Sequence, residues 1–89
     1  MKAMQMKDYG PASDLSLADA PTPKINNDQI LVKVGAAGVN PVDTYIRSGT
    51  NNYSANFPHT PGSDGAGTVV ELGANVTGFE VGQRVYFSR

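Results

Sequence analysis

Alternating apolar and polar positions predict several short strands in this chain of 89 residues. The strongest alternation covers residues 29–37, where Ile30, Val32 and Val34 are expected to share one face. Residues 15–17 also alternate and could pair with the chain's beginning as a hairpin. Shorter apolar stretches predict three more strands, at residues 1–6, 68–72 and 84–87. Because turns rich in Gly, Pro and Asn separate these stretches, the pattern favours a twisted β-barrel or sandwich.

The segment from Asn40 to Gly49 predicts the one helix of the chain. Asn40 can accept hydrogen bonds from the unpaired amides at a helix start, and Pro41 suits the first helical position. Asp43 adds a negative charge at the positive end of the helix dipole. We therefore expect a helix from Pro41 to Ser48, ending where Gly49 adopts a left-handed conformation.

Side chains of this predicted helix allow both structural and functional interpretations. Val42 and Ile46, four residues apart, would form the buried stripe with Tyr45 beside it, and Arg47 would project toward solvent or a ligand. Helix capping alone accounts for Asn40 and its acidic partner, packing accounts for Tyr45, and a solvated charge accounts for Arg47. The spacing of these residues leaves both interpretations open.

A glycine-rich run, GSDGAG at residues 62–67, invites comparison with the phosphate-binding loop of nucleotide-binding domains. Such a loop follows a strand and opens a helix, whose N-terminus meets the phosphates. Here a Pro-Gly turn precedes the run and the strand TVVEL follows it, so a phosphate loop is rejected. We expect these glycines to permit a sharp turn and a close approach to a neighbouring strand or ligand.

The composition excludes several kinds of function. The net charge is −1 and there is no basic cluster, so nucleic acid is not an expected partner. The chain has no cysteine and one histidine, His59, which is expected to be a loop residue and not a ligand or base. Asp43 and Asp64 could pair as carboxylates, but no residue marks them as an acid–base couple. The lack of a long apolar run predicts a soluble, cytoplasmic protein without membrane contact.

The two segments GVNPVDTYIRSG and PHTPGSDGAG carry a resemblance to a known family. Together they resemble the N-terminal, GroES-like domain of the medium-chain dehydrogenase/reductase superfamily, and within it the zeta-crystallin type of NADPH:quinone reductase. The resemblance covers nearly the whole chain. It implies a mainly β fold over residues 1–89: a GroES-like, partly open β-barrel with one short helix, forming the N-terminal part of a two-domain α/β reductase.

The same resemblance bears on zinc. Zinc-dependent alcohol dehydrogenases of the superfamily have Cys-His where this chain has Asn40-Pro41, and Gly-His-Glu where it has Gly62-Ser63-Asp64. The amide and hydroxyl that replace the Cys and His ligands bind zinc poorly. The resemblance therefore implies the zinc-independent branch, in which hydride passes from NADPH to a quinone or another small electron-poor acceptor.

Motif by motif, the resemblance assigns roles to five residues. Asn40 would lie near the nicotinamide and substrate, and Tyr45 would contact the cofactor, which makes both of them catalytic and cofactor-binding candidates. Arg47 and Tyr53 would bind substrate, Tyr53 from an Asn-rich loop at residues 50–57 that forms the pocket rim. Asp43 would brace the helix.

The chain contains no strand, Gly-rich turn and helix of the kind that begins a Rossmann domain. It also stops two residues after the apolar strand residue Phe87, so we expect a truncated chain that is inactive alone. The resemblance implies that the full-length reductase is a homo-oligomer. Two alternatives remain: a zinc-free reductase of enals or enoyl thioesters, and a non-catalytic GroES-like binding module. The sequence does not choose the acceptor.

Overall fold

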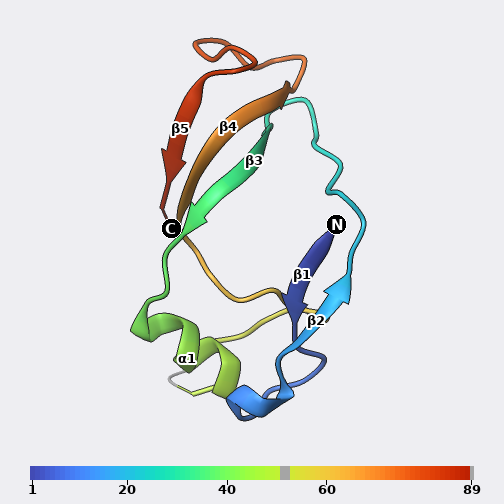
Figure 1. Ribbon diagram of the computed structural model, residues 1–89, viewed down its shortest axis with the longest axis vertical. Coiled ribbons are helices and arrows are strands. Elements are labelled where there is room, and N and C mark those ends of the chain that lie inside the picture. The colour runs from blue at the N-terminus through green and yellow to red at the C-terminus, as the bar shows by residue number, and fades with distance from the viewer. Residues whose placement is uncertain (51–52, 89) are drawn as a thin grey trace. The chain divides into compact units, whose positions relative to one another are not determined.

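The computed structural model describes residues 1–50 and 53–88, which divide into two compact units. The first unit comprises Met1–Pro21 and Val39–Ser63, and the second comprises Thr22–Gly38 and Asp64–Arg89. Strands make up most of the regular secondary structure of the described residues, and α1 is the single α-helix among them (Figure 1). The expected mainly β fold with one short helix is therefore confirmed.

A two-stranded hairpin opens the first unit. Strand β1 (Lys2–Gln5) pairs antiparallel with β2 (Ser16–Asp19), so that Met4 lies opposite Leu17. This pairing confirms the predicted hairpin, and a short 3₁₀ helix (η1, Ala12–Asp14) precedes the second strand. The chain just after β1 is held from another side, because Met6 and His59 exchange two backbone hydrogen bonds of 2.9 and 3.0 Å.

Helix α1 (Pro41–Ser48) has the bounds that the sequence predicts. Asn40 and Asp43 form a capping box at its start, where the backbone N–H of Asn40 donates to Asp43 Oδ2 across 2.9 Å. At its end Gly49 adopts the left-handed conformation, with φ 74°. Ile46 is only 6% exposed and anchors the helix in the small core of the first unit.

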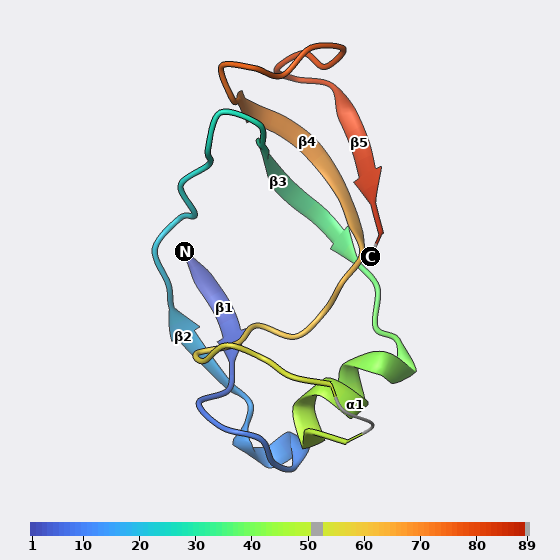
Figure 2. The same cartoon turned by 180° about the vertical axis from the view of Figure 1, so that it is seen from behind.

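Three antiparallel strands form the sheet of the second unit. They are β3 (Ile30–Ala37), β4 (Gly65–Leu72) and β5 (Arg84–Phe87), with β4 in the centre. Figures 1 and 2 show the three strands side by side in a twisted sheet. Val69 of the central strand is completely buried, so the core of this unit lies against β4.

The glycine-rich run differs in part from its predicted structure. The sharp turn expected at residues 62–67 is wrong for its second half, because β4 already begins at Gly65 instead of at Thr68. A Cβ atom on Gly67 would overlap the Lys33 carbonyl oxygen, and one on Gly65 would lie 2.9 Å from the Ala36 carbonyl oxygen. The predicted close approach to a neighbouring strand is thus confirmed, and since a strand follows the run, so is the rejection of a phosphate loop.

Strand β3 does not keep the simple alternation that its sequence suggests. Its register with β4 is irregular between Leu31 and Val32 and again between Val34 and Ala36. Such bulges interrupt the period of two that places alternate residues on one face. Val32 and Val34 lie in an unbroken part of the register, opposite Val69 and Gly67, so they share one face as predicted. Val34 is nevertheless 54% exposed, whereas Ile30 and Val32 are half-buried.

Across residues 1–50 and 53–88, the structure holds no helix with the length and apolar character needed to cross a bilayer. The α1 helix has only eight residues.

Candidate functional site

The four predicted site residues all lie in the first unit, on α1 and just beyond its ends: Asn40, Tyr45, Arg47 and Tyr53. Asn40 is half-buried at the helix start, where the capping box fixes its backbone. Asp43 is 9% exposed, and its second carboxylate oxygen, Oδ1, has no hydrogen-bond partner in the described part of the chain. Burial of a carboxylate at a helix start fits a structural role for Asp43, as the sequence suggests.

Two of the predicted residues meet directly. The rings of Tyr45 and Tyr53 stack with centroids 6.2 Å apart and an interplanar angle of 23°. Tyr45 is 40% exposed and Tyr53 is 37% exposed, so aromatic surface of both residues stays open. Phenol rings bind flat conjugated groups by stacking, and their hydroxyls can donate or accept hydrogen bonds. The pair is therefore suited to bind a planar organic molecule.

Arg47 is placed differently from the prediction. Its Nε donates a hydrogen bond to the Gly10 carbonyl oxygen across 3.1 Å, and the Gly10 amide donates to the Arg47 carbonyl oxygen across 2.9 Å. The side chain is half-buried, and its Nε is bound to the connection between β1 and β2. The prediction that Arg47 projects toward solvent or a ligand therefore did not foresee that its Nε binds a backbone oxygen of the same unit. Its role in binding substrate stays a prediction.

Tyr9, which lies in the turn after β1, is a further residue near the candidate site that no sequence motif marks. The Tyr9 hydroxyl accepts a hydrogen bond of 3.0 Å from the Ala55 amide, and its ring meets Phe57 edge-on at a centroid distance of 4.9 Å. Tyr9 thus holds the segment that follows Tyr53. The neighbouring Gly and Pro indicate a turn, but no pattern in the sequence indicates a partner 46 residues away.

The remaining titratable candidates, His59 and Asp64, both make hydrogen bonds through their backbone atoms. His59 pairs through its backbone with Met6, as described above, and Asp64 lies in the second unit, where its carbonyl oxygen accepts a hydrogen bond of 3.1 Å from the Gly38 amide. No group of three or more His, Cys, Asp or Glu side chains in residues 1–50 and 53–88 could hold a metal ion.

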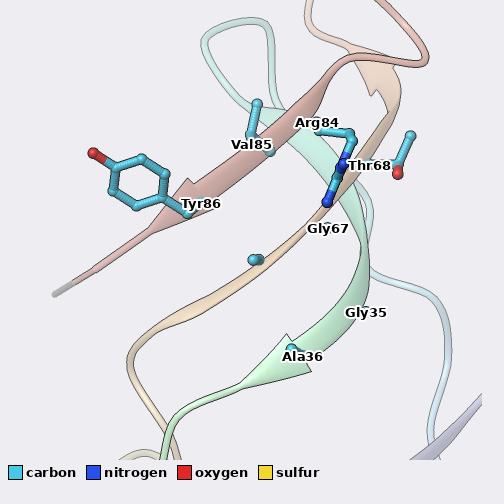
Figure 3. A pocket seen from close by; sticks show the side chains of 8 residues that line it. Gly35, Ala36, Gly67, Thr68, Arg84, Val85 and Tyr86 are labelled. Atoms are coloured by element: carbon cyan, nitrogen blue, oxygen red, sulfur yellow. The ribbon is translucent and has the colours of Figure 1, made fainter.

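The second unit carries a hollow of about 660 Å³ on its sheet (Figure 3). Small residues of β3 and β4 form its floor, and β5 contributes larger side chains; its lining consists of Gly35, Ala36, Ala66, Gly67, Thr68, Arg84, Val85 and Tyr86. Tyr86 extends outward and is 86% exposed. None of the predicted site residues lines this hollow, so the candidate site stays with α1 and the tyrosine pair.

Comparisons with known proteins identify a family for the chain. The family described as alcohol dehydrogenase GroES-like domain matches residues 26–89. A human quinone oxidoreductase is 44% identical over 89 residues, which cover 99% of this chain and 27% of the human protein. A 2-methylene-furan-3-one reductase of Solanum lycopersicum is 41% identical over 88 residues, covering 97% of this chain and 23% of the tomato protein.

A solved structure of a quinone oxidoreductase is also similar to this chain. The crystal structure of Escherichia coli quinone oxidoreductase in complex with NADPH matches with a TM-score of 0.92 at 27% identity, covering 100% of this chain and 27% of that one. The chain thus spans about a quarter of the length of each of these proteins.

Proposed function

Because the chain belongs to the alcohol dehydrogenase GroES-like domain family of the medium-chain dehydrogenase/reductase superfamily, we propose that it is the substrate-side domain of an NADPH-dependent quinone reductase. In this proposal residues 1–89 form the N-terminal domain, and a Rossmann domain that holds most of the cofactor follows in the full-length protein. The quarter-length match to the human quinone oxidoreductase supports this organisation. The domain alone would be inactive.

The observation that carries the proposal is the stacked pair of Tyr45, on α1, and Tyr53, in the segment after the helix end. A nicotinamide ring and a quinone are both flat and conjugated, and the pair offers partly exposed aromatic faces of that kind. The Asn40 amide carries both a donor and an acceptor, which suits a carboxamide or a quinone oxygen. The residues present therefore fit NADPH and a flat acceptor.

Each residue then has a defined task. Asn40 and Tyr45 hold and orient the nicotinamide end of NADPH, while Tyr53 and Arg47 bind the acceptor. When bound, NADPH supplies the hydride that reduces the acceptor. The chain contributes orientation of the two reactants, which can lower the barrier of a two-reactant step by several kcal/mol, up to roughly 7–11.

We further propose that this chemistry proceeds without zinc. Asn40 and Ser63 stand where the superfamily's zinc enzymes carry ligands, and their amide and hydroxyl are weak zinc ligands. The absence of cysteine from the sequence supports the same conclusion. A quinone accepts hydride readily, so the reaction needs no Lewis acid to polarise a carbonyl.

The acceptor class has a second candidate. The tomato relative is a 2-methylene-furan-3-one reductase, and its 41% identity favours a conjugated enone or enal as an alternative acceptor. Such molecules are also flat and electron-poor, so the tyrosine pair would accommodate either class.

Steady-state assays of the full-length protein test both the activity and the acceptor. NADPH oxidation is followed with matched series of quinones, enals and enoyl thioesters, before and after treatment with a zinc chelator. We expect the highest kcat/KM with a quinone and no loss after chelation. An enal preference would replace quinone with the second candidate, and failure to oxidise NADPH with any acceptor would reject the reductase function and leave a binding module.

A further inference from the structure

The turn after β1 contacts both segments that carry the proposed binding residues. Tyr9 and Gly10 belong to this turn, which the sequence alone marks only as a chain reversal. Two bonds between Gly10 and Arg47 tie the turn to the last part of α1. The bond from Tyr9 to Ala55 ties the same turn to the loop beyond the helix.

The fit between Tyr9 and the helix end is close. A Cβ atom on Gly49 would lie 3.0 Å from two atoms of the Tyr9 ring, and Gly49 has a positive φ that side chains rarely adopt. The residue that ends α1 therefore provides the space that the Tyr9 ring occupies. The same ring meets Phe57 edge-on, at 84°. Tyr9 is half-buried in this position.

Tyr53 lies on the chain between these two points of attachment. Its amide donates to the Thr50 carbonyl oxygen across 3.2 Å, and the Thr50 amide donates to the Tyr45 carbonyl oxygen across 3.0 Å. These bonds hold Tyr53 to the helix end. Two residues later, the Ala55 amide is held by the Tyr9 hydroxyl. The backbone of Tyr53 is thus restrained on both sides, and its ring stacks on Tyr45.

We propose that Tyr9 is a positioning residue for the acceptor, acting through the loop that carries Tyr53. The inference rests on the proposed function, in which Tyr53 binds the acceptor and Tyr45 the cofactor. In this proposal Tyr9 touches neither molecule; its hydroxyl fixes the backbone after Tyr53, and its ring packs edge-on against Phe57. Loss of the hydroxyl therefore weakens acceptor binding more than cofactor binding.

The test compares Tyr9→Phe with wild type in the full-length protein, and Tyr86→Phe serves as the matched control. Tyr9→Phe keeps the ring against Gly49 and Phe57 but removes the hydroxyl oxygen to which the Ala55 amide donates its hydrogen bond. Tyr86 is 86% exposed on β5, so its hydroxyl is not expected to support a loop. Tyr9→Leu, which also loses the edge-on ring contact, extends the series.

Two readouts separate positioning from general stability. Hydrogen exchange of the peptide covering residues 53–58 should become faster in Tyr9→Phe, with exchange in β4 unchanged. The KM for the acceptor should rise roughly threefold to tenfold, the effect of one lost hydrogen bond, while the KM for NADPH stays within about twofold. Tyr9→Leu should show larger changes in the same direction, and Tyr86→Phe none.

The outcomes are distinct. Unchanged exchange at residues 53–58, or equal increases in both KM values, would overturn the positioning role while leaving the reductase function intact. A lower melting temperature with unchanged KM values would also overturn it, since Tyr9 would then act only in stability. An inactive wild-type protein would reject the proposed function, and with it the acceptor role of Tyr9, whatever the exchange data show for the loop.

Discussion

Arg47 and Gly10 are joined by two hydrogen bonds that run in opposite directions. The Arg47 Nε donates to the Gly10 carbonyl oxygen at 3.1 Å, and the Gly10 amide donates to the Arg47 carbonyl oxygen at 2.9 Å. A side chain that the sequence assigns to substrate therefore also connects the helix to a turn 37 residues away. The guanidinium Nε is engaged in the fold, so replacing Arg47 has a structural consequence apart from any effect on substrate.

Replacing Arg47 by alanine should lower the free energy of unfolding by about 1–2 kcal/mol, because one partly buried side-chain bond and the packing of the aliphatic stem are lost. Arg84→Ala is the matched control, since Arg84 is exposed on β5 and its loss should cost less than about 0.5 kcal/mol. Denaturant unfolding of the full-length protein measures both. Equal stability of the two variants would show that the Nε bond contributes nothing.

Asp43→Ala should destabilise the protein by about 1–3 kcal/mol, because it removes the buried half of the capping box. Asp43→Asn keeps an oxygen for the Asn40 amide and should lose less. As a control, Asp19→Ala removes an exposed ion pair with Lys2, for which about 0–1 kcal/mol is expected. Unfolding curves in which Asp43→Ala and Asp19→Ala coincide would argue against a capping role.

Gly67→Ala should be one of the most damaging small substitutions in the second unit. The added methyl group would overlap the Lys33 carbonyl oxygen, and backbone of the neighbouring strand cannot move without breaking the β3–β4 ladder. A loss of about 1–3 kcal/mol follows from such overpacking. Gly35→Ala is the control, because its Cβ would lie 3.8 Å from the nearest atom. Comparable melting temperatures for the two variants would contradict this account of the β4 glycines.

The sequence predicts the local elements well. The bounds of α1 follow from its own residues, since Asn40 and Asp43 mark its start and Gly49 marks its end. The hairpin and the strands likewise follow from alternation and turn residues. Irregular positions were less predictable: the register shifts between β3 and β4 and the early start of β4 at Gly65 depend on how two strands fit together, and neither strand encodes that fit alone.

Contacts distant in the sequence could not be predicted from local patterns. The stacking of Tyr45 on Tyr53, the turn of Arg47 toward Gly10 and the bond from Tyr9 to the loop all join segments whose proximity depends on the folded unit. The types of residue at the candidate site could be named from the motif. The way in which they support one another could not.

Asn40 is expected to act both in the fold and at the site, and two substitutions separate these roles. Asn40→Ser retains an oxygen suited to cap α1 and should keep nearly the stability of wild type, whereas Asn40→Ala should lose about 1 kcal/mol. Both variants lack the amide and should show a lower kcat/KM for the acceptor. Melting temperatures and kinetics are measured on the same samples; a fully active Asn40→Ser enzyme would restrict Asn40 to capping.

The proposal that Tyr45 on α1 binds NADPH is tested most directly by Tyr45→Phe in the full-length protein. Phenylalanine keeps the ring that stacks on Tyr53 but removes the hydroxyl, so the fold should be intact. We predict a higher KM for NADPH, by roughly threefold to tenfold for one lost hydrogen bond, with an unchanged melting temperature and no effect in Tyr86→Phe. Identical kinetic constants for wild type and Tyr45→Phe would contradict the account, because Tyr45 would then only pack against its neighbour.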